Sequence, residues 1–135
     1  MADIITHAGE EYLIKNGFDG ATIDTGLYND TTDSLNKDSI DPDTDVTSEP
    51  TGTGYDRQTE TPSSSKDGNW KISYSVTFDT EDSNEDVDAI FSTINFDSTE
   101  GGSLSDWIVY AADLSQTRDL THVDQLDVNI DVIVT

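Results

Sequence analysis

Two segments of the chain alternate between apolar and polar side chains, with Ile133 as the exception, and both predict half-buried strands. In residues 69–80 the apolar positions are Trp70, Ile72, Tyr74, Val76 and Phe78. In residues 126–135 they are Leu126, Val128, Ile130, Val132 and Val134. Successive side chains of a strand point to opposite faces, so each segment presents one buried and one wet face, as in an antiparallel sheet.

Two further segments, residues 87–96 and 107–114, carry apolar side chains on both faces. This pattern favours interior strands, and we expect these two at the centre of the fold. Another strand is predicted over residues 21–28, where Ala21, Ile23, Thr25 and Leu27 share a face and a polar Asn-Asp pair follows.

One short helix is predicted, from about residue 7 to residue 16. Thr6 is suited to the N-cap, and Gly17 stands just past the expected end. Leu13 and Phe18 would then make the apolar contact of a glycine-terminated helix. A helix of this length is not stable alone, so it must dock on the rest of the protein.

Residues 29–65 are rich in Asp, Thr and Ser and contain all three prolines. Such a long polar stretch predicts an acidic loop, because loops of this length are usually binding loops or disordered segments. A short edge strand at Thr53–Thr59, carrying Tyr55, is expected inside it. The whole pattern predicts one domain over residues 1–135, mainly β: an antiparallel β-sandwich or jelly roll with a short N-terminal helix.

The charge of the chain narrows the classes of partner. There are 29 acidic and 6 basic residues, a formal net charge of -23, and no cysteine. A field of this sign repels phosphate backbones and anionic lipids, so we expect no nucleic-acid and no membrane partner. The balance is typical of a halophilic protein, since molar salt screens the self-repulsion. The alternative explanation of this composition is intrinsic disorder, which the regular strand patterns disfavour.

The residue types needed for catalysis are not arranged in a recognisable pattern. Carboxylates are so abundant that a pair of them carries no signal, because a catalytic pair also needs burial. His7 and His122 are far apart in sequence, and no nucleophile-elbow motif is present. We therefore predict that the protein is not an enzyme.

A weak candidate for a metal site is Asp41, Asp43 and Asp45, which match the opening of a calcium-binding loop. Val46 occupies the position that needs glycine, and Gly52 the position of the closing glutamate. A solvated acidic loop is therefore the favoured interpretation. No cofactor is predicted, beyond loosely bound Na, K, Ca or Mg ions.

Aromatic side chains could also stack on a carbohydrate. Trp70, Tyr74 and Trp107 are the candidates, but all three lie in strand patterns where packing in the core is the favoured interpretation.

Five segments together resemble small virion structural proteins of tailed viruses. They are residues 6–17 (THAGEEYLIKNG), 25–30 (TGLYND), 48–50 (SEP), 54–58 (GYDRQ) and 114–120 (LSQTRDL). In those proteins a short N-terminal helix precedes a small strand, a turn ending in G-Y-x-R-Q, and a β-rich C-terminal half. With the acidity, the resemblance implies a tailed virus of halophilic archaea.

The resemblance implies a non-enzymatic virion structural subunit, most specifically a capsid-surface decoration or turret protein that forms a homo-oligomer in high salt. It would be made in the host cytoplasm, reside in the virion, and contact itself and capsid, portal or tail proteins. An alternative is a tail or baseplate subunit that binds a host-surface glycan. A halophilic cellular protein of similar fold is a third interpretation.

The expected contacts between subunits come from apolar side chains and arginines. The interface candidates are Ile4, Ile5, Tyr12, Leu13, Tyr55, Arg57 and Arg118. A guanidinium can hold a carboxylate with two parallel hydrogen bonds, which suits a subunit boundary. Each arginine could equally pair within its own subunit, and both alternatives stay open from sequence.

Overall fold

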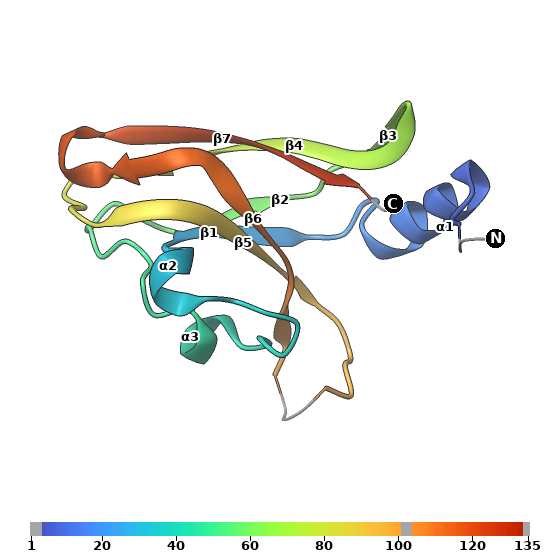
Figure 1. The fold of residues 1–135 in the computed structure, drawn as a ribbon, viewed down its shortest axis with the longest axis horizontal. Helices are drawn as coiled ribbons and strands as arrows, with labels where there is room; N and C mark the ends of the chain where they lie inside the picture. The colour runs from blue at the N-terminus through green and yellow to red at the C-terminus, as the bar shows by residue number, and fades with distance from the viewer. Residues whose placement is uncertain (1–3, 101–103, 134–135) are drawn as a thin grey trace.

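The chain folds as two antiparallel β-sheets packed face to face, seen edge-on in Figure 1. This computed structural model describes residues 4–100 and 104–133. The first sheet has the order β2 (Gln58–Glu60), β1 (Ile23–Tyr28), β5 (Asp86–Asn95) and β6 (Asp106–Asp119). The second has the order β3 (Ser64–Asp67), β4 (Asn69–Asp79) and β7 (Gln125–Ile133). The predicted fold class, a mainly antiparallel β-sandwich with a short N-terminal helix, is confirmed.

The main core lies between the sheets and follows the alternating patterns of β4 and β7. These strands pair antiparallel from Lys71 opposite Ile133 to Asp79 opposite Gln125. Their inward residues meet Leu27 and Ile90 of the first sheet in one buried cluster, which includes Ile72, Val76, Phe78, Val128, Ile130 and Val132. The outward residues form a wet ladder of hydrogen bonds, Ser73 to Asp131, Ser75 to Asn129 and Thr77 to Asp127.

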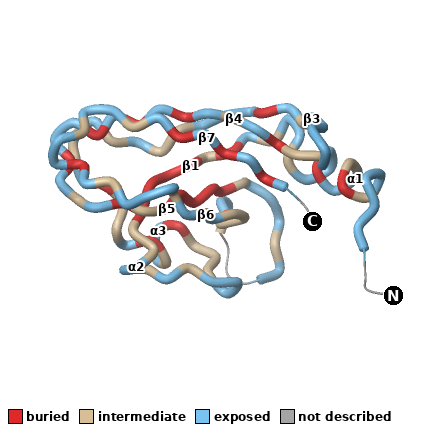
Figure 2. The backbone as a smooth tube through the Cα atoms, turned by 45° about the horizontal axis from the view of Figure 1, so that its top comes forward, coloured by how far each residue is buried: buried red, intermediate tan, exposed pale blue. Residues whose placement is uncertain are grey.

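A second, smaller apolar cluster involves the other face of the first sheet. Tyr28, Ala89 and Phe91 are buried there together with Val46, and Leu35 and Ile108 pack against them. The single-turn helices α2 (Asp30–Asp33) and α3 (Pro42–Asp45) lie beside this sheet, on the side away from β4 and β7 (Figure 1). The apolar residues on both faces of β1 and β5 are thus explained, and β1 is buried along most of its length (Figure 2).

Helix α1 (His7–Gly17) begins as predicted, with the Thr6 hydroxyl accepting from the Gly9 N–H at 3.1 Å. Its end differs from the prediction. Gly17 is the last helical residue, Phe18 is the C-cap, and the left-handed turn comes later at Gly20, with φ +73°. Ile14 is the apolar residue of the helix that is buried, whereas Leu13 is 45% exposed. The helix therefore docks through the Ile14 face.

The segment predicted as a long acidic loop packs against its own chain. It contains α2, α3, β2 and the start of β3. The short edge strand expected at Thr53–Thr59 is displaced: β2 covers Gln58–Glu60, and Tyr55 precedes it. Carboxylates hold this segment in place, because Asp33 accepts from the N–H groups of Thr47 and Ser48 and Asp45 accepts from those of Ile40 and Asp41.

The predicted central position of residues 107–114 is wrong, while that of residues 87–96 is right. β5 lies between β1 and β6, but within the described part of the chain β6 pairs with β5 alone and is an edge strand. Its start is apolar on both faces because Ile108, like Leu35, packs against the smaller apolar cluster. A bond from the Ile108 N–H to the Ile40 carbonyl, at 3.0 Å, also covers this first part of the edge.

Candidate functional site

An open groove runs between the two sheets along β6 and β7, which are the edge strands on one side of the sandwich. The cavity has a volume of about 400 Å³. Its apolar lining includes Ile90 from the central strand β5, Leu114 from β6, and Leu126, Val128 and Ile130 from β7. The core residues among them stay buried, with Ile90 2%, Val128 7% and Ile130 4% exposed, while Leu114 and Leu126 are half-buried.

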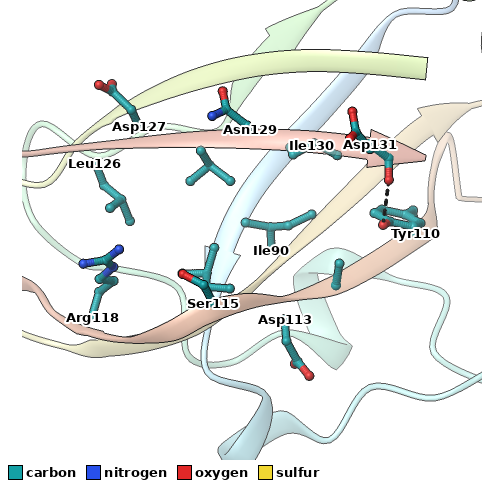
Figure 3. A pocket seen from close by; sticks show the side chains of 13 residues that line it. Ile90, Tyr110, Asp113, Ser115, Arg118, Leu126, Asp127, Asn129, Ile130 and Asp131 are labelled. Carbon is teal, nitrogen blue, oxygen red and sulfur yellow. Dashed lines mark hydrogen bonds between the residues drawn. The ribbon is translucent and has the colours of Figure 1, made fainter. Parts of the chain in front are cut away.

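The polar side chains of the groove are arranged so that one charge faces it (Figure 3). Asp127 and Asn129 point away on the outer face of β7, and Asp113 points away from β6. Arg118 extends from β6 toward Leu126 across the groove. At the other end the Tyr110 hydroxyl donates to the Asp131 carbonyl at 3.3 Å.

Arg118 forms no ion pair with any carboxylate in the described part of the chain. It is partly buried, at the end of β6. Its lack of an ionic partner is unusual in a chain with 29 acidic residues. An arginine in this position can bind a carboxylate brought by another molecule.

The backbone edges beside the groove are also long. β6 has 14 residues and β7 has 9, and within residues 4–100 and 104–133 neither has a strand on its outer side. Long unpaired edges can pair with another chain, and proteins usually shorten or cover them. On the opposite side the edge strands β2 and β3 have three and four residues.

An exposed apolar surface belongs to α1 and the segment before it. Tyr12 is 67% and Leu13 45% exposed, and Ile4 and Ile5 are exposed just before the helix. Ile5 precedes the N-cap Thr6, and its side chain lies close to Gly9 in the first turn. We call these four residues the helix face. It lies on a helix at the end of the sandwich, where α1 packs against β4 (Figure 1).

The candidates Tyr55 and Arg57 lie elsewhere, in a cluster around Glu49. The Tyr55 hydroxyl donates to Glu49 at 2.7 Å, and Arg57 donates to it from Nη2 at 2.6 Å and from Nε at 3.2 Å. Of the two alternatives for Arg57, the structure shows the pair within its own chain. Burial, and then the Glu49 carboxylate, raise the pKa of Tyr55, so its hydroxyl keeps the proton that it donates.

The Glu49 cluster also completes the edge of β1. β2 covers only Ile23 to Thr25, and beyond it the Leu27 N–H donates to the Tyr55 hydroxyl at 2.9 Å. Gly26 makes the close approach possible, because a Cβ there would lie 2.5 Å from the Phe91 ring and 3.0 Å from Glu49. The Arg57 guanidinium lies over the Phe91 ring, 5.2 Å from its centroid.

The three aspartates considered for a metal serve separate local contacts. Asp41 caps α3 by accepting from the Asp43 N–H at 2.9 Å, and Asp43 pairs with Arg57 at 3.2 Å. Asp45 accepts from two backbone N–H groups, as described above. No group of three or more His, Asp or Glu side chains in the described residues is arranged to hold a metal ion.

The aromatic candidates for sugar stacking lie in or against the core. Trp107 is 3% exposed, and Tyr74 packs on the main core with its hydroxyl 3.0 Å from that of Ser92. Trp70 also packs there, and the Lys15 ammonium lies 5.0 Å from its ring centroid.

Sequence reasoning named Arg118 but missed the other residues of the groove, such as Leu114, Leu126 and Val128. Their alternation indicates a buried face, and only the strand order reveals that this face is open at one side. No helix in residues 4–100 and 104–133 is long and apolar enough to span a membrane. No protein family, curated protein or solved structure matches this chain.

Proposed function

We propose that this protein is a non-enzymatic structural subunit of a virion, placed on the capsid surface, that assembles with copies of itself in high salt. The observation that carries the proposal is the helix face, an exposed apolar surface, on a molecule that also has an open groove between β6 and β7. Apolar surface exposed in patches marks sites of association. A subunit with both features can contact two neighbours.

The charge of the chain supports a dependence on salt. With a net charge of -23, two copies repel each other strongly in dilute buffer. In molar salt the Debye length falls to about 3 Å, so apolar contacts can form despite the charge. The homo-oligomer is therefore expected only when the repulsion is screened.

The virion part of the proposal is supported by the resemblance to tailed-virus proteins. Several residues that carry it, among them Leu27, Glu49, Tyr55 and Arg57, meet in the cluster around Glu49. Their shared contacts explain why segments so far apart in sequence would occur together. The role that they support is structural, because they hold the edge of β1 and the segment that covers it.

The first test of self-assembly is the molar mass in solution, measured by light scattering after size exclusion. In molar salt we expect one discrete multiple of 14.7 kDa, which dissociates or unfolds in dilute buffer. A folded monomer of 14.7 kDa under both conditions would overturn the self-assembling subunit.

The second test concerns the place of the protein. Antibodies raised against the purified chain should label the surface of intact virus particles from the culture in which the gene is expressed. Particles that contain the chain but are labelled only at the tail would contradict the capsid-surface position.

A further inference from the structure

We infer that the groove between β6 and β7 receives the helix face of a second copy of this chain, so that copies join head to tail. This inference rests on the proposed self-assembly and specifies its contacts. The groove side is Leu114, Arg118 and Leu126 with the residues between the sheets, and the helix side is Ile4, Ile5, Tyr12 and Leu13.

The first argument is the distribution of exposed apolar side chains. The described residues include six large exposed ones, and four of them form the helix face. The other two are Phe96 and Ile133. The groove is a cavity of about 400 Å³ in the same molecule with both apolar and polar lining residues, while α1 lies at one end of the sandwich (Figure 1). Tyr12 is the most exposed residue of α1 among these four, so it is the side chain that would enter the cavity.

The second argument is charge complementarity. The groove presents a single charged side chain, the Arg118 guanidinium, which has no ion pair in the described residues. Next to the helix face lies Glu11, whose carboxylate is 40% exposed and is paired only with Lys15, at 3.0 Å. An exposed pair one turn apart contributes little stability, so Glu11 can turn to a new partner. Docking brings this carboxylate to Arg118.

The third argument excludes the symmetric alternatives. A contact of helix face on helix face would leave the groove open and Arg118 without a carboxylate. A contact of groove on groove would place two guanidinium groups in one interface and leave the helix face exposed. Joining the two different surfaces covers both at once. Such a head-to-tail contact generates a ring if its rotation closes, and a filament if it does not.

Two variants, each altering one surface, test the inference in molar salt. The helix variant is Tyr12→Ser with Leu13→Ser, and the groove variant is Arg118→Glu. We expect each to remain folded, by circular dichroism, and to have the mass of a monomer by light scattering. Phe96→Ser is the control, since it removes an apolar side chain that is as exposed as Leu13, at 45%, but lies outside both surfaces, and it should assemble like the unmodified chain.

Mixing the two variants gives the decisive measurement. Each retains one intact surface, so the mixture should form a dimer that neither variant forms alone. A charge exchange, Glu11→Arg with Arg118→Glu in one chain, should restore assembly. If the unmodified chain assembles but the variants assemble equally well, or if their mixture stays monomeric, the head-to-tail contact is wrong while self-assembly stands. If the unmodified chain is a monomer in molar salt, both proposals fail.

Discussion

The two sides of the sandwich differ in how far their edge strands are covered. On the closed side, formed by β2, β3 and residues 48–57, the edge strands are short and side chains complete the edge of β1. On the open side, formed by β6 and β7, the edge strands are long and the groove lies between them. The two arginines follow the same division: Arg57 is held by Glu49, and Arg118 has no ion pair in the described residues.

The polar side chains around Glu49 on the closed side are therefore paired within the chain, whereas Arg118 on the open side is available to another molecule. Contacts on the closed side are internal, so changes there should lower the free energy of unfolding. On the open side, Arg118 has no ion pair in the described residues and contributes little to the stability of the single chain, so a change there should alter association. Four substitutions test this division, and all are best measured by urea unfolding in molar salt.

The largest effect is expected from Glu49→Ala. It leaves the half-buried Arg57 guanidinium without its main partner and the Tyr55 hydroxyl without an acceptor. Removing one member of a largely buried pair should lower the free energy of unfolding by about 2–4 kcal/mol. Asp43→Ala is the control, since Asp43 is the exposed partner of Arg57 and its loss should cost less than about 1 kcal/mol. Equal costs for the two variants would contradict the special position of Glu49.

Gly26→Ala should have the next largest effect. The new Cβ would lie 2.5 Å from the Phe91 ring, which packs edge-on against Tyr28 and cannot move freely. Overpacking of this kind costs about 1–3 kcal/mol. Gly17→Ala is a matched control, because nothing lies within 4 Å of its Cβ position and alanine favours the helix. Adding Phe91→Leu to Gly26→Ala should recover part of the loss, and no recovery would show that the ring is not the cause.

A smaller effect concerns pH and Asp33. Burial acts to raise the pKa of Asp33, but hydrogen bonds from Ser48 and Thr47 outweigh it and hold the pKa below its ordinary value. The unfolded chain therefore binds the proton more readily, so stability rises with pH. This contribution is complete above about pH 4–5 and is lost as the pH falls through the lowered native pKa.

Asp33→Asn should therefore flatten the dependence of the unfolding free energy on pH below about pH 4. Asp38→Asn is the control, since the Asp38 carboxylate accepts no hydrogen bond in the described residues, and it should leave the slope unchanged. An unchanged slope in Asp33→Asn would mean that the contacts with Thr47 and Ser48 do not stabilise the folded chain.

The smallest effect on stability is expected from Arg118→Ala. Without an ion pair, the side chain contributes only the packing of its aliphatic stem. The free energy of unfolding should therefore fall by about 0.5 kcal/mol or less. Association in molar salt should weaken in the same variant. A loss of stability comparable to that of Glu49→Ala would remove the distinction between the two sides.

The strands with one solvent-exposed and one buried face could be predicted from the sequence, because they alternate between polar and apolar residues. The period of two placed β4 within one residue of its observed ends, Asn69–Asp79, and placed the start of β7 within one residue of Gln125. Val134 and Thr135, also predicted in that strand, lie outside the described residues. The pattern ended β6 too early, at Leu114, because the polar residues 115–117 on an edge strand give no periodic signal. These residues are in the strand because β6 continues as far as Asp119, which pairs with Asp86 of β5.

Residues 29–65 were less predictable, because their structure depends on contacts that are distant in sequence. The capping residues Asn29 and Asp41, with Pro42 at the first turn, are recognisable signals of single-turn helices. The burial of Tyr55 and Arg57 is not recognisable, since their partner Glu49 looks like any other surface carboxylate. The interface candidates Ile4, Ile5, Tyr12 and Leu13 are exposed, and their place in an interface stays a prediction.

The carboxylates that accept backbone hydrogen bonds have a consequence for any attempt to adapt this protein to dilute buffer. Such redesign usually neutralises acidic residues according to how exposed they are. Here Asp33 and Glu85 accept backbone N–H groups through both carboxylate oxygens, so an amide in their place would direct a donor at another donor. Asp45 accepts from two N–H groups through one oxygen and is also needed in place. Asp38, Asp56 and Glu60 are exposed, and their carboxylates accept no hydrogen bond in the described residues. To obtain a version of the chain that tolerates low salt, these three residues should therefore be substituted first.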